Sequence, residues 1–172
     1  YDSLGNRLSV DGGAVTAYLR NGLNQYTSVG GISFSYDNNG NLAFDGTLRY
    51  YYDCENRLTD VNDSSDNRVA TYAYDFAGRR VRKTVYNGQN STTKYFGYDG
   101  ANLLAEYDSS GIWPTRVYAH GPAIDMPFMF WDQYTGELYY YFYDGLGNVV
   151  AIMEMFSFNT ERYEYDVFGK PI

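Results

Sequence analysis

The stretch Tyr74-Asp75-Phe76-Ala77-Gly78-Arg79-Arg80-Val81 contains the pattern that decides the fold, Tyr-Asp-x-x-Gly followed by a polar residue and an apolar run. Variants of this pattern return along the whole chain. Asp at the first place and Gly at the fourth suit a type I turn, and Gly readily adopts a left-handed backbone. A type I turn followed by a left-handed residue is a common hairpin loop with a bulge. Each copy therefore predicts the tip of a β-hairpin.

The copies share an Asp at the start of the turn and a Gly three residues later, which is replaced by Asn at positions 56 and 102. Asn tolerates positive φ better than most residues, so it favours the same left-handed turn. We expect structural turn roles for Asp2, Gly5, Asp37, Gly40, Asp53, Asn56, Asp75, Gly78, Asp99, Asn102, Asp108, Gly111, Asp144, Gly147, Asp166 and Gly169.

An aromatic residue precedes most of the Tyr-Asp copies by two positions. Side chains two apart share one face of a strand, so stacked hairpins would bring these rings into ladders across neighbouring strands. The predicted aromatic ladder consists of Phe34, Tyr36, Tyr50, Tyr52, Tyr72, Tyr74, Phe96, Tyr98, Tyr141, Tyr143, Tyr163 and Tyr165.

The composition supports the same architecture. The 172 residues include 21 Tyr, 10 Phe and 2 Trp, so that aromatic residues make up 19% of the chain. Aromatic residues favour strands, and runs typical of helices are few. The sequence predicts an all-β chain of stacked antiparallel β-hairpins that form a curved, spiralling strip. Because the repeats are continuous, we expect residues 1–172 to be a single repeat segment, cut from a longer protein.

The charge excludes several kinds of partner. The chain carries 13 Lys and Arg against 21 Asp and Glu, a net charge of −8, and no basic cluster interrupts it. This argues against nucleic acid or an anionic membrane surface as a partner. No apolar run approaches the roughly 20 residues of a membrane-spanning helix.

Candidate chemical groups are sparse. His120 is the only His, and with Asp125 it lacks a nucleophile or metal partner in a recognisable arrangement. The stretches 37–41 and 63–67 are rich in Asp and Asn, but neither ends in the Glu that a hand-type calcium loop uses. The sequence therefore predicts no catalytic residues, no metal, no cofactor and no enzymatic activity. Glycan contact is expected only at exposed loops.

These motifs resemble those of the YD-repeat, or RHS-repeat, proteins, which include bacterial polymorphic toxins, the C components of insecticidal toxin complexes and the animal teneurins. The resemblance covers essentially the whole chain. Its most specific parts are Val117-Tyr118-Ala119-His120-Gly121-Pro122, Tyr141-Phe142-Tyr143-Asp144-Gly145-Leu146-Gly147-Asn148 and Arg162-Tyr163-Glu164-Tyr165-Asp166-Val167-Phe168-Gly169-Lys170-Pro171.

The resemblance implies a β-sheet strip that winds into a hollow shell around a C-terminal toxin polypeptide, in a bacterial protein that is secreted or held at the cell surface. The family's Asp-Pro-x-Gly-Leu self-cleavage motif is absent from these 172 residues, and we expect no variable effector directly after them. The stretch thus resembles the wall of such a shell, without the self-cleavage motif and without the enclosed toxin polypeptide.

Two functions from different classes remain open. The chain can be a structural shell segment that encloses and protects a toxin polypeptide, with the remaining repeats as its partners. It can also be an adhesive surface or filament module that associates with copies of itself or contacts glycans.

Overall fold

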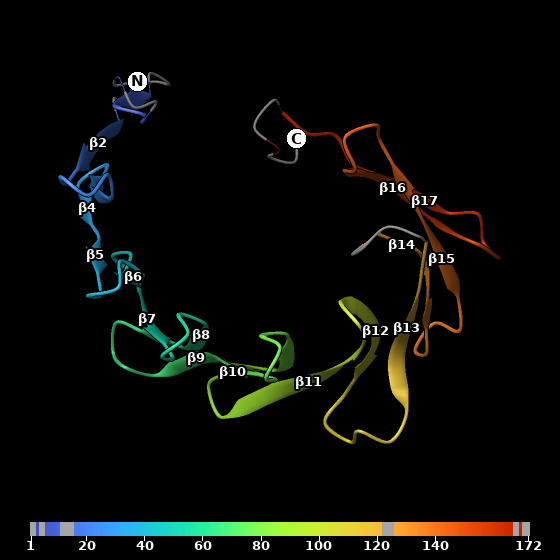
Figure 1. The fold of residues 1–172 in the computed structure, drawn as a ribbon. Coiled ribbons are helices and arrows are strands. Elements are labelled where there is room, and N and C mark those ends of the chain that lie inside the picture. Colours follow the sequence, from blue (N-terminus) through green and yellow to red (C-terminus); the bar gives the residue numbers. More distant parts are fainter. Residues whose placement is uncertain (1–2, 4–5, 11–15, 122–125, 167–168, 170–172) are drawn as a thin grey trace. The chain divides into compact units, whose positions relative to one another are not determined.

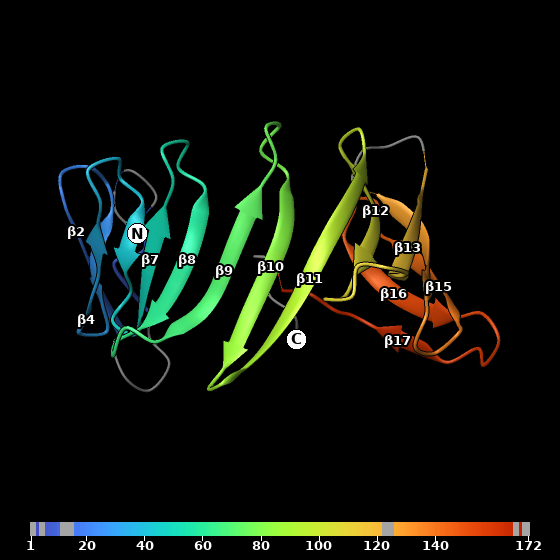
Figure 2. The same ribbon diagram turned by 90° about the horizontal axis from the view of Figure 1, so that it is seen from below.

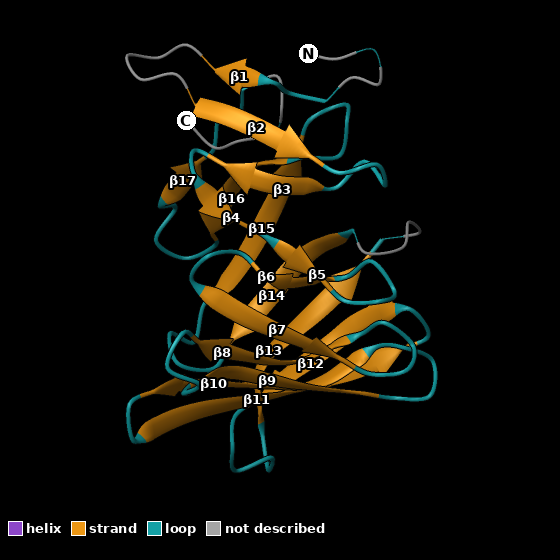
Figure 3. Ribbon diagram, turned by 90° about the vertical axis from the view of Figure 1, so that its left-hand side faces the viewer, coloured by secondary structure: helices purple, strands orange, loops and turns teal. Residues whose placement is uncertain are grey.

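The computed structural model describes residues 3, 6–10, 16–121, 126–166 and 169. Within these residues every regular element is a β-strand, and Figure 3 shows strands and loops without helices. The strands pair antiparallel in two sheets. The predicted all-β class with an antiparallel sheet is therefore confirmed.

The smaller sheet has four strands in chain order. These strands are β1 (Ser9–Val10), β2 (Thr16–Arg20), β3 (Tyr26–Val29) and β4 (Ile32–Ser33).

The larger sheet has 13 strands, and every strand lies beside its neighbours in the sequence (Figure 1). Its strands are β5 (Ser35–Tyr36), β6 (Leu42–Phe44), β7 (Leu48–Tyr52), β8 (Leu58–Asp63), β9 (Arg68–Tyr74), β10 (Arg80–Asn87), β11 (Asn90–Asp99), β12 (Asn102–Tyr107), β13 (Pro114–His120), β14 (Pro127–Asp132), β15 (Leu138–Tyr143), β16 (Val149–Glu154) and β17 (Thr160–Arg162).

The chain divides into two compact units. Unit 1 consists of Tyr1–Ala73 with Thr84–Ser91, and unit 2 consists of Tyr74–Lys83 with Thr92–Ile172. The single repeat segment expected over residues 1–172 stays a prediction, and the two units are described separately below.

Unit 1 shows how a Tyr-Asp copy sits in a hairpin. In Figure 2, β7 and β8 lie side by side and point in opposite directions. Tyr51 pairs with Asp60 and Tyr52 pairs with Leu58, so the register shifts by one residue at the tyrosine of the motif. The same shift occurs where Tyr36 pairs with Leu42. The register shift lies directly before the turn in both hairpins, so it is a feature of the repeat itself.

Unit 2 repeats this arrangement in longer hairpins. Phe142 pairs with Ala151, and Tyr143 pairs with Val149, again with a register shift at the motif tyrosine. In β11 the corresponding shift lies between Gly97 and Tyr98.

Burial in both units is shallow. The buried apolar residues in the described part of the chain are Val61 and Ala70 in unit 1, and Ala105 and Phe130 in unit 2. No described side chain is less than 2% exposed. A sheet that leaves both faces largely open depends on the contacts between neighbouring strands more than on a central core.

Candidate functional site: hairpin tips and cross-strand contacts

The tip at Asp75 is closed by hydrogen bonds from both the backbone and the Asp side chain. The Gly78 N–H donates to the Asp75 carbonyl at 3.0 Å, and the Asp75 N–H donates to the Arg79 carbonyl at 2.9 Å. The Asp75 Oδ1 accepts from the N–H groups of Ala77 and Arg79, both at 2.9 Å. Gly78 has a φ of 80°, in the left-handed region. One carboxylate oxygen thus satisfies two N–H groups of the loop.

The other Asp75 oxygen binds the side chain four residues later. Arg79 Nε donates to Asp75 Oδ2 at 2.7 Å, and Asn148 Nδ2 donates to Asp144 Oδ2 at 2.9 Å in the tip of unit 2. The sequence analysis noted only a polar residue at this place. Its frequent identity as Asn or Arg is the signal that could have identified the partner, since both are donors that reach a carboxylate.

The same turn recurs at most of the expected positions. The Gly40, Asn56 and Gly147 N–H groups each donate to the carbonyl of the Asp three residues before, and all three residues have positive φ. Gly111 and Gly169 make the corresponding bonds to the Asp108 and Asp166 carbonyls, also with positive φ. Asp2 and Gly5 lie outside the described residues.

The copy at Asp99 differs from the expected turn. Asn102 pairs with Asp99 at the start of β12, so only Gly100 and Ala101 form the loop. The left-handed residue is Gly100, with a φ of 57°, and Asn102 is not among the described residues with positive φ. The expected left-handed role of Asn102 is therefore wrong, because a Gly at the first loop position allows a shorter hairpin loop.

The loops considered for calcium are turns of the same kind. Asp37 Oδ1 accepts from the N–H groups of Asn39 and Asn41, and Asp63 Oδ1 accepts from those of Ser65 and Asn67. Among the described residues no group of three or more His, Cys, Asp and Glu side chains could hold a metal ion.

Neighbouring tips in unit 1 are joined by amide side chains. Asn56 Oδ1 accepts from Asn39 Nδ2 at 3.0 Å and from Asn41 Nδ2 at 2.8 Å. Gln25 Nε2 donates to the Gly40 carbonyl at 3.2 Å. Asn at position 56 therefore has a second role besides its left-handed backbone, since its side chain receives the donors of the adjacent tip.

The tyrosine hydroxyl of the motif links one hairpin to the previous one. Tyr52 donates to the Leu42 carbonyl at 3.0 Å, and Tyr165 donates to the Val149 carbonyl at 2.8 Å. Leu42 and Val149 are the first strand residues after the preceding tip. Equivalent bonds join Tyr36 to Tyr26, Tyr98 to Arg80 and Tyr143 to Pro127. We call these hydrogen bonds the tyrosine links.

The predicted ladder residues lie in or beside successive strands of the repeat. Phe34 lies between β4 and β5, while Tyr36, Tyr50, Tyr52, Tyr72, Tyr74, Phe96, Tyr98, Tyr141 and Tyr143 lie in strands, and Tyr163 and Tyr165 follow β17. The main ring cluster of unit 2 is centred on a different residue, Phe130. Its ring is stacked on Tyr139 with centroids 4.6 Å apart, and it lies 5.5 Å from Tyr141. Phe96 and Tyr98 meet guanidinium groups, those of Arg80 at 5.4 Å and Arg79 at 5.0 Å.

Two buried carboxylates lie in the strands around this ring cluster. Glu106 in β12 is 8% exposed and accepts from Lys94 Nζ at 2.6 Å and from the Tyr118 hydroxyl at 2.7 Å. Asp132 in β14 is 5% exposed and accepts from Arg116 Nε at 2.8 Å. Together these contacts tie β11, β12, β13 and β14 to one another through side chains. We call Lys94, Glu106, Arg116, Tyr118 and Asp132 the polar clasp.

The contacts of the polar clasp shift the pKa values of Glu106 and Tyr118. Burial acts to raise the pKa of the Glu106 carboxyl, but the bonds from Lys94 and Tyr118 outweigh it and hold the pKa below its usual value. Burial and the bond to Glu106 raise the pKa of the Tyr118 hydroxyl. Glu106 is therefore held as a carboxylate, and Tyr118 as a neutral phenol. A Glu inside the apolar strand 102–107 is the sequence signal that could have pointed to it.

His120 does not form the pair considered from the sequence, since Asp125 lies outside the described residues. Its Nε2 lies 2.7 Å from the Leu103 carbonyl, which requires Nε2 to carry the proton. Its buried Nδ1 has no hydrogen-bond partner in the described part of the chain. This geometry positions the ring between strands β12 and β13.

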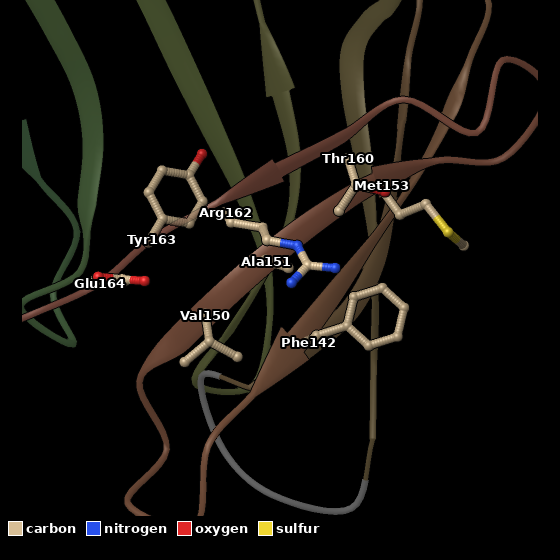
Figure 4. Close-up of a pocket in the computed structure, with 8 residues that line it drawn as sticks. All are labelled: Phe142, Val150, Ala151, Met153, Thr160, Arg162, Tyr163 and Glu164. Carbon is tan, nitrogen blue, oxygen red and sulfur yellow. The ribbon is translucent and has the colours of Figure 1, made fainter.

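An open hollow of about 540 Å³ lies over the last strands of unit 2. Figure 4 shows Phe142 and Met153 among its lining side chains, together with the charged groups of Arg162 and Glu164. The described part of the chain contains no helix with the length and apolar character that a membrane crossing requires.

Comparison with known proteins gives three close relatives of this stretch. No protein-family model matches the chain. The chain is 37% identical over 179 residues to the tRNA3(Ser)-specific nuclease WapA of Bacillus spizizenii and, to the same degree, to the tRNA nuclease WapA of Bacillus subtilis strain 168. It is 38% identical over 152 residues to the tRNA(Glu)-specific nuclease WapA of Bacillus subtilis subsp. natto. The first two matches cover 99% of this chain and 7% of the relative, so the chain spans only a small part of their length.

Solved structures are also similar. The crystal structures of TcdB2-TccC3-Cdc42 and TcdB2-TccC3-TEV each match 92% of this chain and 8% of the solved chain, with a TM-score of 0.45 and sequence identities of 20% and 19%.

The relatives correct one expectation from the sequence. The lack of a recognisable catalytic group led us to expect a protein without enzymatic activity. That expectation is overturned, because all three relatives are named as tRNA nucleases. A stretch that matches 7% of a relative was too small a basis for a statement about activity.

Proposed function

We propose that the chain is an RHS-repeat wall segment of a bacterial nuclease toxin that is secreted or held at the cell surface. In this proposal the wall encloses the polypeptide that cleaves tRNA, and the other repeats of the same protein are its direct partners. Support comes from the similarity to tRNA nucleases over 99% of the chain. Because the chain matches only 7% of each of these relatives, the proposal assigns the nuclease activity to the whole protein and not to this stretch.

The tyrosine links are the observation that best supports the proposed role as a wall segment. Each tyrosine link runs from the residue directly before the Asp of one tip to the first residue of a strand that follows an earlier tip, as between Tyr52 and Leu42 or Tyr165 and Val149. A hydroxyl that reaches back to the previous hairpin, as at these five tyrosines, makes the sheet extendable one repeat at a time. Such nearest-neighbour contacts are the way repeat proteins build long continuous surfaces.

The polar clasp adds resistance to shear between strands. Glu106 and Asp132 are buried and paired, and removal of one partner would leave a buried group unsatisfied. Strands tied through both backbone and side chains can therefore form a wall that keeps its register. This is a mechanical property that an enclosing shell requires.

The proposal is tested on the full-length protein in which the chain occurs. Purified protein is treated with trypsin, and tRNA cleavage is followed over the course of digestion. We expect the activity to survive in the parent protein and to be lost faster in the double variant Tyr52→Phe/Tyr143→Phe, which lacks two tyrosine links. The matched control is Tyr51→Phe, since Tyr51 is 44% exposed and its hydroxyl makes no hydrogen bond within the described residues. Equal loss of activity in the parent and the double variant contradicts an enclosing wall.

A second candidate is an adhesive module that self-associates or contacts glycans. The observation that favours it is the shallow burial, with large apolar residues such as Phe76 at 98% exposed and Leu146 at 89% exposed. Light scattering of the 172-residue chain tests this alternative. Growth of particles with concentration supports it, and a stable monomer at all concentrations argues against it.

A further inference from the structure

The dipeptide Asn-Gly occurs three times in the chain, at Asn21-Gly22, Asn39-Gly40 and Asn87-Gly88. In this dipeptide the Asn side chain and the backbone nitrogen of the Gly can react with each other, because Gly has no side chain that hinders their approach. The three copies differ in how the folded chain engages these two groups.

The copy at Asn87-Gly88 lies in the turn between β10, which ends at Asn87, and β11, which begins at Asn90 (Figure 2). Residues 87–90 are all exposed, and a Cβ added at Gly88 would meet no atom within 4 Å. In the part of the chain that the structure describes, no hydrogen bond engages the Asn87 side chain or the Gly88 N–H. Both reacting groups are therefore unrestrained and open to water.

The Asn21 side chain, by contrast, is held by hydrogen bonds within its own turn. Its Oδ1 accepts from the N–H groups of Leu23 and Gln25, both at 3.0 Å. Its Nδ2 donates to Gln25 Oε1 at 2.8 Å. Attack by the Gly22 nitrogen requires the side chain to turn its Cγ toward that nitrogen, so these bonds must break before the reaction begins.

At Asn39-Gly40 both reacting groups are engaged. Asn39 Nδ2 donates to Asn56 Oδ1 at 3.0 Å, and the Gly40 N–H donates to the Asp37 carbonyl at 3.1 Å. The nucleophile in this reaction is the deprotonated backbone nitrogen, so a hydrogen bond that holds the Gly40 proton opposes the first step. Of the three copies, Asn87-Gly88 is thus the one without such a restraint.

We propose that Asn87 is a site of spontaneous deamidation, with the Gly88 backbone nitrogen as the nucleophile. Base removes the Gly88 N–H proton, and the nitrogen attacks Asn87 Cγ. The new N–Cγ bond closes a cyclic imide, while the Cγ–Nδ2 bond breaks and the side-chain nitrogen leaves as ammonia after it takes a proton from water. Water then opens the imide at either of its carbonyls, which gives Asp or isoaspartate. The reaction needs only water and base, so it does not depend on the proposed wall role.

Either product changes the turn between β10 and β11. A carboxylate replaces the amide, which adds a negative charge to a chain whose net charge is −8. Isoaspartate also adds one carbon atom to the main chain, because the backbone then runs through the Cγ of residue 87. A two-residue hairpin loop admits few backbone conformations, so we expect the extra atom to loosen this end of the hairpin. The turn therefore changes as the protein ages.

The experiment uses freshly purified full-length protein, incubated in its folded state at neutral and mildly alkaline pH. Peptide mapping by mass spectrometry follows the conversion of amide to carboxyl at each of the three Asn-Gly copies, and isoaspartyl methyltransferase labels the isoaspartate peptides. Asn87 should deamidate about tenfold or more faster than Asn21 and Asn39, since each hydrogen bond that must break slows the reaction several-fold. Its rate should rise with pH, because the nitrogen must lose its proton. Asn87→Gln should remove the labelled peptide, since a ring that is one atom larger closes more slowly.

The matched control is the same protein unfolded in urea. All three copies have Gly as the next residue, so their rates should become similar once the hydrogen bonds of Asn21, Asn39 and Gly40 are lost. Circular dichroism verifies the folded and the unfolded state. A folded protein in which Asn87 reacts no faster than the other two overturns the proposal. A preference for Asn87 that persists unchanged in urea also overturns it, because the preference would then arise from neighbouring residues and not from the folded turn.

Discussion

The hydroxyl of Tyr52 donates a 3.0 Å hydrogen bond to the carbonyl oxygen of Leu42, which lies in the strand after the preceding hairpin tip. The motif tyrosine of this repeat is thus the residue whose hydroxyl hydrogen-bonds the repeat to the preceding one. At the five copies with a tyrosine link, Phe in place of Tyr would keep the ring but lose the donor.

We predict that Tyr52→Phe lowers the free energy of unfolding by about 1 kcal/mol, because the half-buried Leu42 carbonyl loses its side-chain donor. Tyr143→Phe should act similarly, since Tyr143 donates to the Pro127 carbonyl at 2.6 Å. Urea unfolding measures both. Tyr51→Phe is the control within the same strand, and a loss as large as that of Tyr52→Phe would show that the tyrosine link is not the cause.

We predict that Asp75→Ala lowers the thermal midpoint and that Asp75→Asn lowers it less. Ala removes the acceptor for the Ala77 and Arg79 N–H groups, whereas an Asn oxygen can retain it. The chain contains such a case, since Asn21 Oδ1 accepts from the Leu23 and Gln25 N–H groups at 3.0 Å. Calorimetry compares the variants, and equal midpoints for Ala and Asn would count against the acceptor role of the side chain.

Two glycines of a single tip provide a matched test of backbone conformation. Gly147 has a φ of 86°, Gly145 is not in the positive-φ region, and an added Cβ meets no atom within 4 Å at either position. Gly147→Ala should therefore cost about 1 kcal/mol, because an L-residue is strained in the left-handed region. Gly145→Ala should be neutral or slightly stabilising, since it restricts the unfolded chain. Chemical denaturation of both variants decides whether φ is the controlling factor.

Stability should decline in acid because of the tip aspartates. The side-chain bond from Asn148 holds the pKa of Asp144 below its ordinary value of 3.8, and Asn41 does the same for Asp37. A lowered pKa in the folded state contributes stability that is complete above the unfolded pKa and is lost as the pH falls through the folded one. We expect the thermal midpoint to fall as the pH drops below 3.8.

The double variant Asp37→Asn/Asp144→Asn tests the origin of this acid dependence. It should be less stable than the parent at neutral pH and should lose less stability between neutral and acidic pH. A fall in midpoint as steep as that of the parent would assign the acid dependence to other carboxylates, such as Glu106 and Asp132 of the polar clasp.

Local interactions explain why the hairpins were predictable from the sequence. The bonds of Asp75 span two and four residues, and the left-handed position at Gly78 depends on the residue that occupies it. These preferences act within one loop, so they are present in the sequence wherever the motif appears. The recurrence of the motif then implies antiparallel neighbours in chain order, as the larger sheet shows.

Contacts between strands were decided only by the tertiary structure. Glu106 and Tyr118 are joined because β12 and β13 pair in one register, and the stacking of Phe130 on Tyr139 depends on the register of β14 with β15. A motif of five residues contains no information about which residue of a neighbouring strand lies opposite. The shorter loop at Gly100 also displaced Asn102 into a strand, although its spacing matched the other tips.

The sequence by itself therefore determined the all-β class, the order of the hairpins and the turn at most tips, because these follow from backbone preferences over a few residues. The tertiary structure alone decided the partners of the tyrosine hydroxyls, the polar clasp and the second role of Asn56. These depend on register shifts such as that at Tyr52, where one extra residue in the facing strand changes which groups meet. Their energies arise between residues that are distant in the chain, and only the folded sheet brings those residues together.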